Sequence, residues 1–168
     1  MNELRDIARS RSESDMNTRL TDLAADVQAL QRQLSATGQL RSGNMLRGVL
    51  KIAQESLRSH AVALSENYSW AVNEALAASQ SWVRKLAAEA ADSMRPLFMA
   101  GSEQLTAACK LADQPQLAAR LIADLETTHL QSREAILVAL DAKFASRSRG
   151  MLKWVGSLFG LLKGSSGK

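Results

Sequence analysis

The sequence predicts an all-α fold, and three observations support this. Among 168 residues there are 27 Ala and 25 Leu but only 7 Val and 4 Ile, so strong helix formers greatly outnumber β-branched strand formers. There are two prolines, and they lie far along the chain, at Pro96 and Pro115. Apolar residues recur at helical spacing over most of the length. We therefore expect long helices with coiled-coil-like packing in an elongated bundle, followed by a short amphipathic C-terminal helix.

Residues 1–15 are expected to form a polar N-terminal arm, and residues 16–37 a heptad helix. In the heptad helix the apolar residues alternate at spacings of four and three, which is a 3.5-residue repeat. This repeat forms a seam of Met16, Leu20, Leu23, Val27, Leu30 and Leu34. A helix with so few heptads is only marginally stable in isolation. We therefore expect a partner helix in the same chain or the same oligomer. Our interpretation is that the seam joins copies.

Residues 44–149 are expected to form a helical body that begins after a break between Gly38 and Gly43. From 44 to 95 the apolar pattern fits an 11-residue repeat, which favours nearly straight helix packing. Leu50, Val72 and Val83 lie on this face and are assigned to the same oligomer seam. The pattern predicts one long helix over 44–95, although a hairpin break near residues 66–67 remains an alternative.

Two shorter helices are expected to complete the body. Pro96 is expected to end the long helix, because the residue before a proline avoids the α conformation. A short helix over 102–113 follows, with Ser102 at its start. Pro115 then opens a helix over 115–147, and Gly150 is placed just past its end.

The tail, residues 150–168, carries the most informative pattern in the chain. On a helical wheel the apolar residues of MLKWVGSLFGLLK occupy one half, and the lysines, glycines and serine occupy the other half. A cationic helix of this kind can lie in a membrane interface, with its apolar half among the acyl chains. The predicted membrane-binding or partner-binding residues are Met151, Leu152, Lys153, Trp154, Val155, Leu158, Phe159, Leu161, Leu162 and Lys163.

Three glycines of the tail share a ridge of that helix. Gly156, Gly160 and Gly164 are four residues apart, a spacing that lets another helix approach closely. Each interior glycine costs about 1 kcal/mol of helix stability relative to alanine. We therefore expect the tail to be helical when it is bound to something. The alternative is that its apolar face docks on the protein's own helices or in the groove of a partner protein.

The formal net charge of +4 belongs to the C-terminal part of the chain. From Lys143 onward there are six basic residues and no acid, whereas the preceding 142 residues carry 15 basic and 17 acidic groups. Nucleic-acid binding is therefore expected to be nonspecific and auxiliary at most. The expected partners are other copies of the chain, other helical structural proteins and a membrane surface, with no small-molecule substrate.

The sequence shows no catalytic, cofactor or metal-binding pattern, so an enzyme is not expected. His60 and His129 lack a ligand-type neighbour and are expected to be solvated or to cap helices. Cys109 lies among alanines and is expected to be a small buried thiol. The first 15 residues lack an apolar signal region, so synthesis in the cytoplasm without a signal peptide is expected.

In its alanine-rich long helix, heptad seam and membrane-active tail, the chain resembles the small helical virion proteins of tailed bacteriophages, including internal ejection proteins. This resemblance implies incorporation into a virion, homo-oligomeric assembly and membrane contact during genome delivery. The function expected is therefore that of a non-enzymatic structural protein that forms part of a conduit. The alternative function is a soluble coiled-coil adaptor whose C-terminal helix docks on a partner protein.

Overall fold

The computed structural model describes the backbone of residues 1–163 and the side chains of residues 1–149. The described part is all-α, as the composition predicts, and contains helices and turns without a β-strand. The elements in chain order are α1 (Asn2–Ala36), α2 (Gly43–Glu74), α3 (Gln80–Asp92), α4 (Arg95–Leu111), the 3₁₀ turn η1 (Pro115–Leu117) and α5 (Ala118–Lys163).

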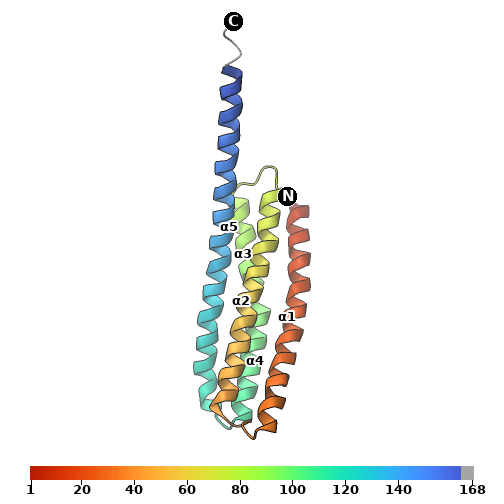
Figure 1. Ribbon diagram of the computed structural model, residues 1–168, viewed down its shortest axis with the longest axis vertical. Coiled ribbons are helices and arrows are strands. Elements are labelled where there is room, and N and C mark those ends of the chain that lie inside the picture. Colours follow the sequence, from red (N-terminus) through yellow and green to blue (C-terminus); the bar gives the residue numbers. More distant parts are fainter. Residues whose placement is uncertain (164–168) are drawn as a thin grey trace.

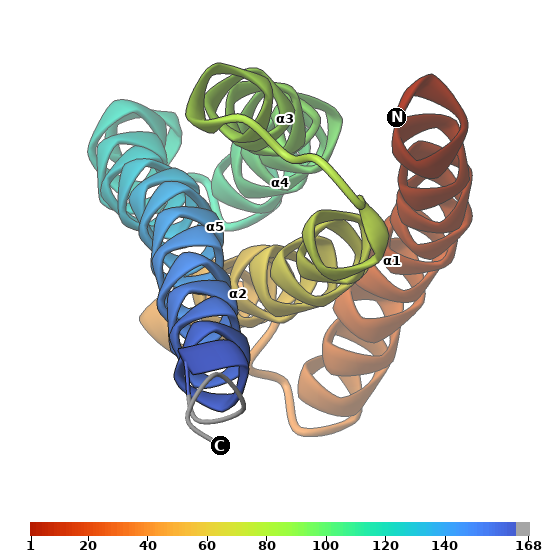
Figure 2. The same cartoon turned by 90° about the horizontal axis from the view of Figure 1, so that it is seen from above.

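The helices form an elongated up-and-down bundle of four rods (Figure 1). One rod is α1, the next is α2, the third consists of α3 and α4 placed end to end, and the fourth is α5. Helix α2 is central and packs against all the other α-helices, whereas α1 and α5 lie on opposite sides of it (Figure 2). The N-terminus, the turn between α2 and α3, and the C-terminal part of α5 share one end of the molecule.

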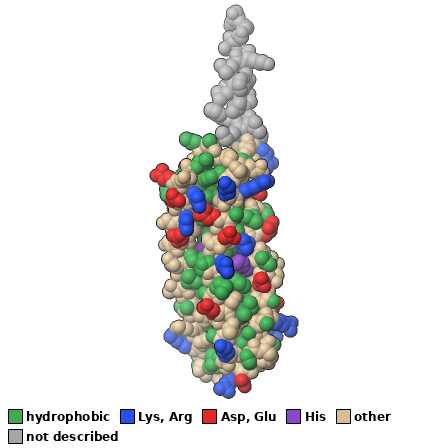
Figure 3. All heavy atoms as spheres, turned by 180° about the vertical axis from the view of Figure 1, so that it is seen from behind, with side chains coloured by type: hydrophobic (Ala, Val, Ile, Leu, Met, Phe, Trp, Pro, Cys, Tyr) green, Lys and Arg blue, Asp and Glu red, His purple; other side chains and the backbone are tan. Residues whose placement is uncertain are grey.

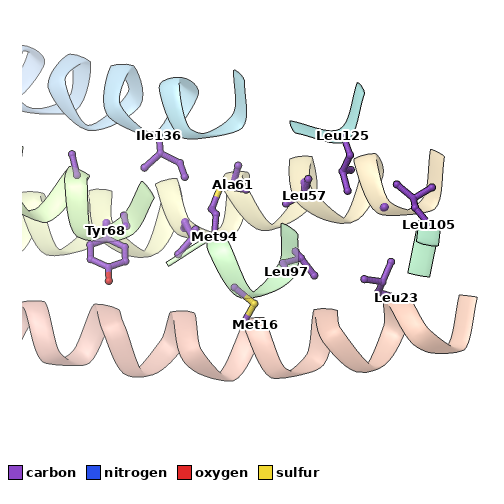
Figure 4. Close-up of a cluster of buried hydrophobic side chains, with 14 of the residues drawn as sticks. Met16, Leu23, Leu57, Ala61, Tyr68, Met94, Leu97, Leu105, Leu125 and Ile136 are labelled. Carbon is purple, nitrogen blue, oxygen red and sulfur yellow. The ribbon is translucent and has the colours of Figure 1, made fainter. Parts of the chain in front are cut away.

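A single hydrophobic core runs along the bundle, and charged side chains of both signs are spread over its surface (Figure 3). The core is built from Leu, Met and Ala side chains, with Tyr68 as its largest fully buried member. Figure 4 shows side chains from all the rods meeting along α2. The many alanines let the rods approach closely, so the core is long and thin.

The predicted oligomer seam is part of this internal core, which corrects the interpretation that it joins copies. Met16, Leu23 and Val27 are buried, and Leu20, Leu30 and Leu34 are half-buried against the same cluster. Their partner helix is chiefly α2 of the same chain. The contact is close at Gly48, where an added Cβ would lie 2.5 Å from Leu30 Cδ2.

The apolar face formed by the 11-residue repeat of residues 44–95 is internal as well. Val72 and Val83 are fully buried, and Leu50 is half-buried against the core. A helix pattern shows which face is buried but not whether the covering helix belongs to the same chain. Here the chain folds back and covers its own face.

The expected continuous helix over 44–95 is wrong, and so is the alternative break at 66–67. The chain turns at residues 75–79, so that α3 runs back along α2. Ser79 is the one polar residue in the predicted 11-residue face, and it is the N-cap of α3, where its hydroxyl accepts a hydrogen bond from the Trp82 backbone N–H at 3.2 Å. The turn contains neither glycine nor proline, so the sequence lacks the residues that most strongly indicate a turn.

The region around Pro96 also differs from the prediction. Helix α4 begins at Arg95, and Pro96 lies in its first turn, where a missing N–H leaves no hydrogen bond unmade. The expected helix over 102–113 is therefore only the later part of α4. Ser102 does not cap a helix, because its hydroxyl donates to the Phe98 carbonyl oxygen one turn earlier at 2.9 Å.

The N-terminal end is more helical than expected, and the expected helix break near Gly150 is absent. Residues 2–15 are the start of α1 rather than a separate arm, and Ala8 and Ser12 are buried against the bundle. Helix α5 begins at Ala118 after the 3₁₀ turn that contains Pro115, and it continues through Gly150 to Lys163 instead of ending near Arg147. A glycine allows a helix to end but does not force it to end.

Candidate functional site

The predicted binding tail is the last part of α5. The backbone of residues 151–163 continues the helix past the ends of the other rods (Figure 1). The side chains predicted to bind a membrane or partner, from Met151 to Lys163, lie outside the described side chains, as do Gly156 and Gly160 of the ridge. Gly164 lies outside the described residues altogether. The structure thus places this tail as an extension of a bundle helix.

Arg147 fixes the base of this extension to the rest of the bundle. Its guanidinium group donates hydrogen bonds to the backbone carbonyl oxygens of Val72 and Ala75, at the C-terminal end of α2. The last carbonyls of a helix have no partner within the helix and carry partial negative charge, so a guanidinium group suits this position. The sequence predicts a helix that ends at residue 147, but it gives no sign that Arg147 caps a different helix.

The turn at residues 75–79 lies beside this base and exposes an apolar side chain. Leu76 is 93% exposed, the highest value among the large hydrophobic residues with described side chains. Trp70 and Trp82 flank the turn and are half-buried, and the Arg11 guanidinium lies 4.3 Å from the centroid of the Trp70 ring. Hydrophobic side chains are visible at this end of the bundle, with charged side chains of both signs below them (Figure 3). This end therefore combines apolar and charged groups.

A buried polar pair joins α1 to α2 in the middle of the bundle. His60 is fully buried, and its Nδ1 lies 2.6 Å from Asp15 Oδ2. Arg19 lies 3.5 Å from the other carboxylate oxygen of Asp15. Burial lowers the pKa of His60, and the contact with Asp15 offsets part of that change. The expectation of a solvated His60 is wrong, because the sequence gives no sign that Asp15 is its partner.

His129 is buried too, on the side of α5 that faces α4. Its ring meets the Phe98 ring edge to face, with centroids 4.7 Å apart. Burial lowers the pKa of His129, and the nearby Arg133 adds to this effect while Glu126 opposes it. His129 therefore acts as a packing residue rather than a solvated one.

Several hollows open on the described surface of the bundle. A cleft of about 650 Å³ lies between α1 and the α3–α4 rod, where Arg5 Nε and Glu89 Oε2 are 2.6 Å apart and Tyr68 and His60 line the wall. Burial, with the help of Glu89, raises the pKa of Tyr68 to about 12. A groove of about 570 Å³ between α2 and α5 is lined mainly by Ala and Ser. Neither hollow contains a nucleophile paired with a base.

The remaining reactive groups are dispersed. Cys109 is buried, as predicted, and burial raises its pKa, which keeps it a thiol. Within the described residues no group of three or more His, Cys, Asp and Glu side chains is placed to hold a metal ion. Likewise, none of the helices over the described range is sufficiently long and apolar to cross a bilayer.

Comparisons with family models, with curated proteins and with solved structures find no match to this chain. Its function must therefore be argued from the geometry. The feature that stands out is the end of the bundle from which α5 extends, with Arg147 at its base and Leu76 beside it.

Proposed function

We propose that this protein is a non-enzymatic helical structural protein that attaches to a membrane surface through residues 151–163 of α5. The observation that carries the proposal is that α5 continues beyond the bundle into a segment whose sequence is cationic and amphipathic. Thirteen residues make about 20 Å of helix, which is enough to lie in an interface and too short to cross a bilayer.

The internal position of the seam changes how copies could associate. Because Val27, Val72 and Val83 are buried in the core of one chain, a homo-oligomer would need a different contact surface. The ridge of Gly156, Gly160 and Gly164 supports close packing of tails once they are bound to the membrane. A place in a phage virion remains a prediction from the sequence resemblance.

The second candidate is a soluble adaptor whose extended helix docks in the groove of a partner protein. The same apolar half of residues 151–163 favours it, since amphipathic helices also bind hydrophobic grooves. The basic residues and the absence of acids from Lys143 onward favour an anionic lipid surface instead.

Vesicle flotation with the intact chain tests the proposal. We expect the protein to float with vesicles of phosphatidylcholine and phosphatidylglycerol, and less with phosphatidylcholine alone. Leu158→Asp should weaken this binding about 10- to 100-fold, because a leucine loses roughly 1.5–3 kcal/mol of apolar burial and a charge is added. Val138→Asp is the matched control, since Val138 is 57% exposed on α5 within the bundle.

Equal flotation of the intact chain and Leu158→Asp, or no flotation of either, would contradict the proposal. A partner protein that is captured by the intact chain and lost with Leu158→Asp, in the absence of lipid binding, would support the adaptor instead.

A further inference from the structure

The turn between α2 and α3 has an unusual composition for an exposed turn. Residues 75–79 read Ala-Leu-Ala-Ala-Ser, whereas exposed turns ordinarily carry Gly, Pro, Asn, Asp or Ser. Ala75 is buried and holds the turn to the bundle, while Leu76 projects with 93% of its surface exposed. The other two connections between rods, residues 37–42 and 112–114, are largely polar. At this exposure the Leu76 side chain makes almost no contact that would stabilise the bundle.

This turn is physically joined to the base of the C-terminal extension. Arg147 of α5 donates a hydrogen bond to the carbonyl oxygen of Ala75, the first residue of the turn. Both features lie at the same end of the bundle (Figure 1). The turn therefore lies beside the point where residues 151–163 leave the bundle.

The neighbours of the turn suit a lipid interface. Trp82 is half-buried in the first turn of α3, and tryptophan favours the level of the headgroups. Arg84 and Lys85 follow on exposed positions of α3. Between residues 70 and 88 the chain carries two basic residues, Arg84 and Lys85, and one acid, Glu74. Ser79 caps α3 and holds the turn in place through its hydrogen bond from the Trp82 N–H.

We propose that the turn at residues 75–79 is a second membrane contact, in which Leu76 inserts among the lipids while Arg84 and Lys85 meet anionic headgroups. This inference rests on the proposed function and adds a second contact, at the α2–α3 end of the bundle beside the base of the tail. One leucine among alanines is too small for a protein interface, which needs about 800 Å² from each partner. A single inserted side chain, by contrast, adds usefully to an existing membrane anchor.

An environment-sensitive fluorophore at position 76 tests the inference directly. The NBD group is attached to a Leu76→Cys variant of the full chain, in which the native Cys109 is buried and does not react. Adding phosphatidylcholine–phosphatidylglycerol vesicles should increase the NBD emission and shift it to shorter wavelength. The same fluorophore on Val62→Cys is the control, because Val62 is 58% exposed and lies twelve residues before the end of α2, away from the turn. Its emission should remain unchanged.

A label-free variant guards against an effect of the fluorophore. Leu76→Asp should lower vesicle binding about three- to tenfold and leave the melting temperature unchanged, since the side chain makes almost no contact within the fold. The double variant Arg84→Glu, Lys85→Glu should also lower vesicle binding, because it replaces two basic neighbours of the turn with acids.

The outcomes separate the two claims. If the chain binds vesicles but the emission at position 76 does not change, this inference is overturned and the proposed function stands. If the chain does not bind vesicles, both are overturned. An emission change without lipid that grows with protein concentration would assign the turn to a contact between copies and overturn the lipid contact.

Discussion

Replacing Val83 by Asp is expected to unfold the chain. Val83 is fully buried in α3, within the core that α3 shares with α2 and α5. A carboxylate placed there without a partner costs more than about 4–5 kcal/mol, which is comparable with the whole stability of a small domain. Circular dichroism should show most of the helical signal lost at 25 °C, and the hydrodynamic radius should increase.

This substitution distinguishes a core residue from an oligomer contact. If Val83 instead joined two copies of the chain, Val83→Asp would give a folded protein of lower mass in solution. Val62→Asp is the control, since Val62 is 58% exposed, and it should stay within about 0.5 kcal/mol of the parent. Retention of the parent's melting temperature by Val83→Asp would contradict the fold described above.

Acidification is expected to destabilise the protein below pH 6.5. His60 and His129 are both buried, and burial lowers the pKa of each below its ordinary value of 6.5. The unfolded chain therefore binds protons at a higher pH than the folded chain does. The free energy of unfolding is at its full value above pH 6.5 and falls as the pH drops below it, by up to about 1.4 kcal/mol per pH unit for each histidine.

Urea unfolding at a series of pH values between 7.5 and 5 measures this effect. The double variant His60→Gln, His129→Gln should show a much flatter dependence, because glutamine does not titrate. Asp15 and Glu126 lie near the two rings and attract the protonated forms, so they reduce the effect without reversing its direction. A parent protein whose stability is constant over this range, or a double variant with the parent's slope, would rule out this role for the histidines.

Much of the fold can be predicted from local patterns. The heptad of residues 16–34 and the 11-residue face of residues 46–94 identify the residues that the structure buries or half-buries, because helical periodicity reports which side avoids water. The sequence does not reveal which helix covers each face. The turn at Leu76 is hidden because alanine and leucine are good helix formers, and only Ser79 marks it.

The contacts that organise the candidate site depend on residues far apart in the chain. Arg147 binds carbonyl oxygens of residues 72 and 75, and His60 contacts Asp15. No local pattern encodes such pairs, because each depends on how two helices align in space. The pattern of the tail from Met151 onward is local, so its amphipathic character can be predicted directly from the sequence.

Hydrogen exchange of residues 151–163, measured with and without anionic vesicles, tests the central claim most directly. A segment with glycines at 156 and 160 that extends past the other rods should exchange quickly in the lipid-free chain and slowly on vesicles. The buried amides of α2 should stay equally protected in both samples. Strong protection of residues 151–163 in the lipid-free monomer, or none on vesicles, would contradict membrane attachment through this helix.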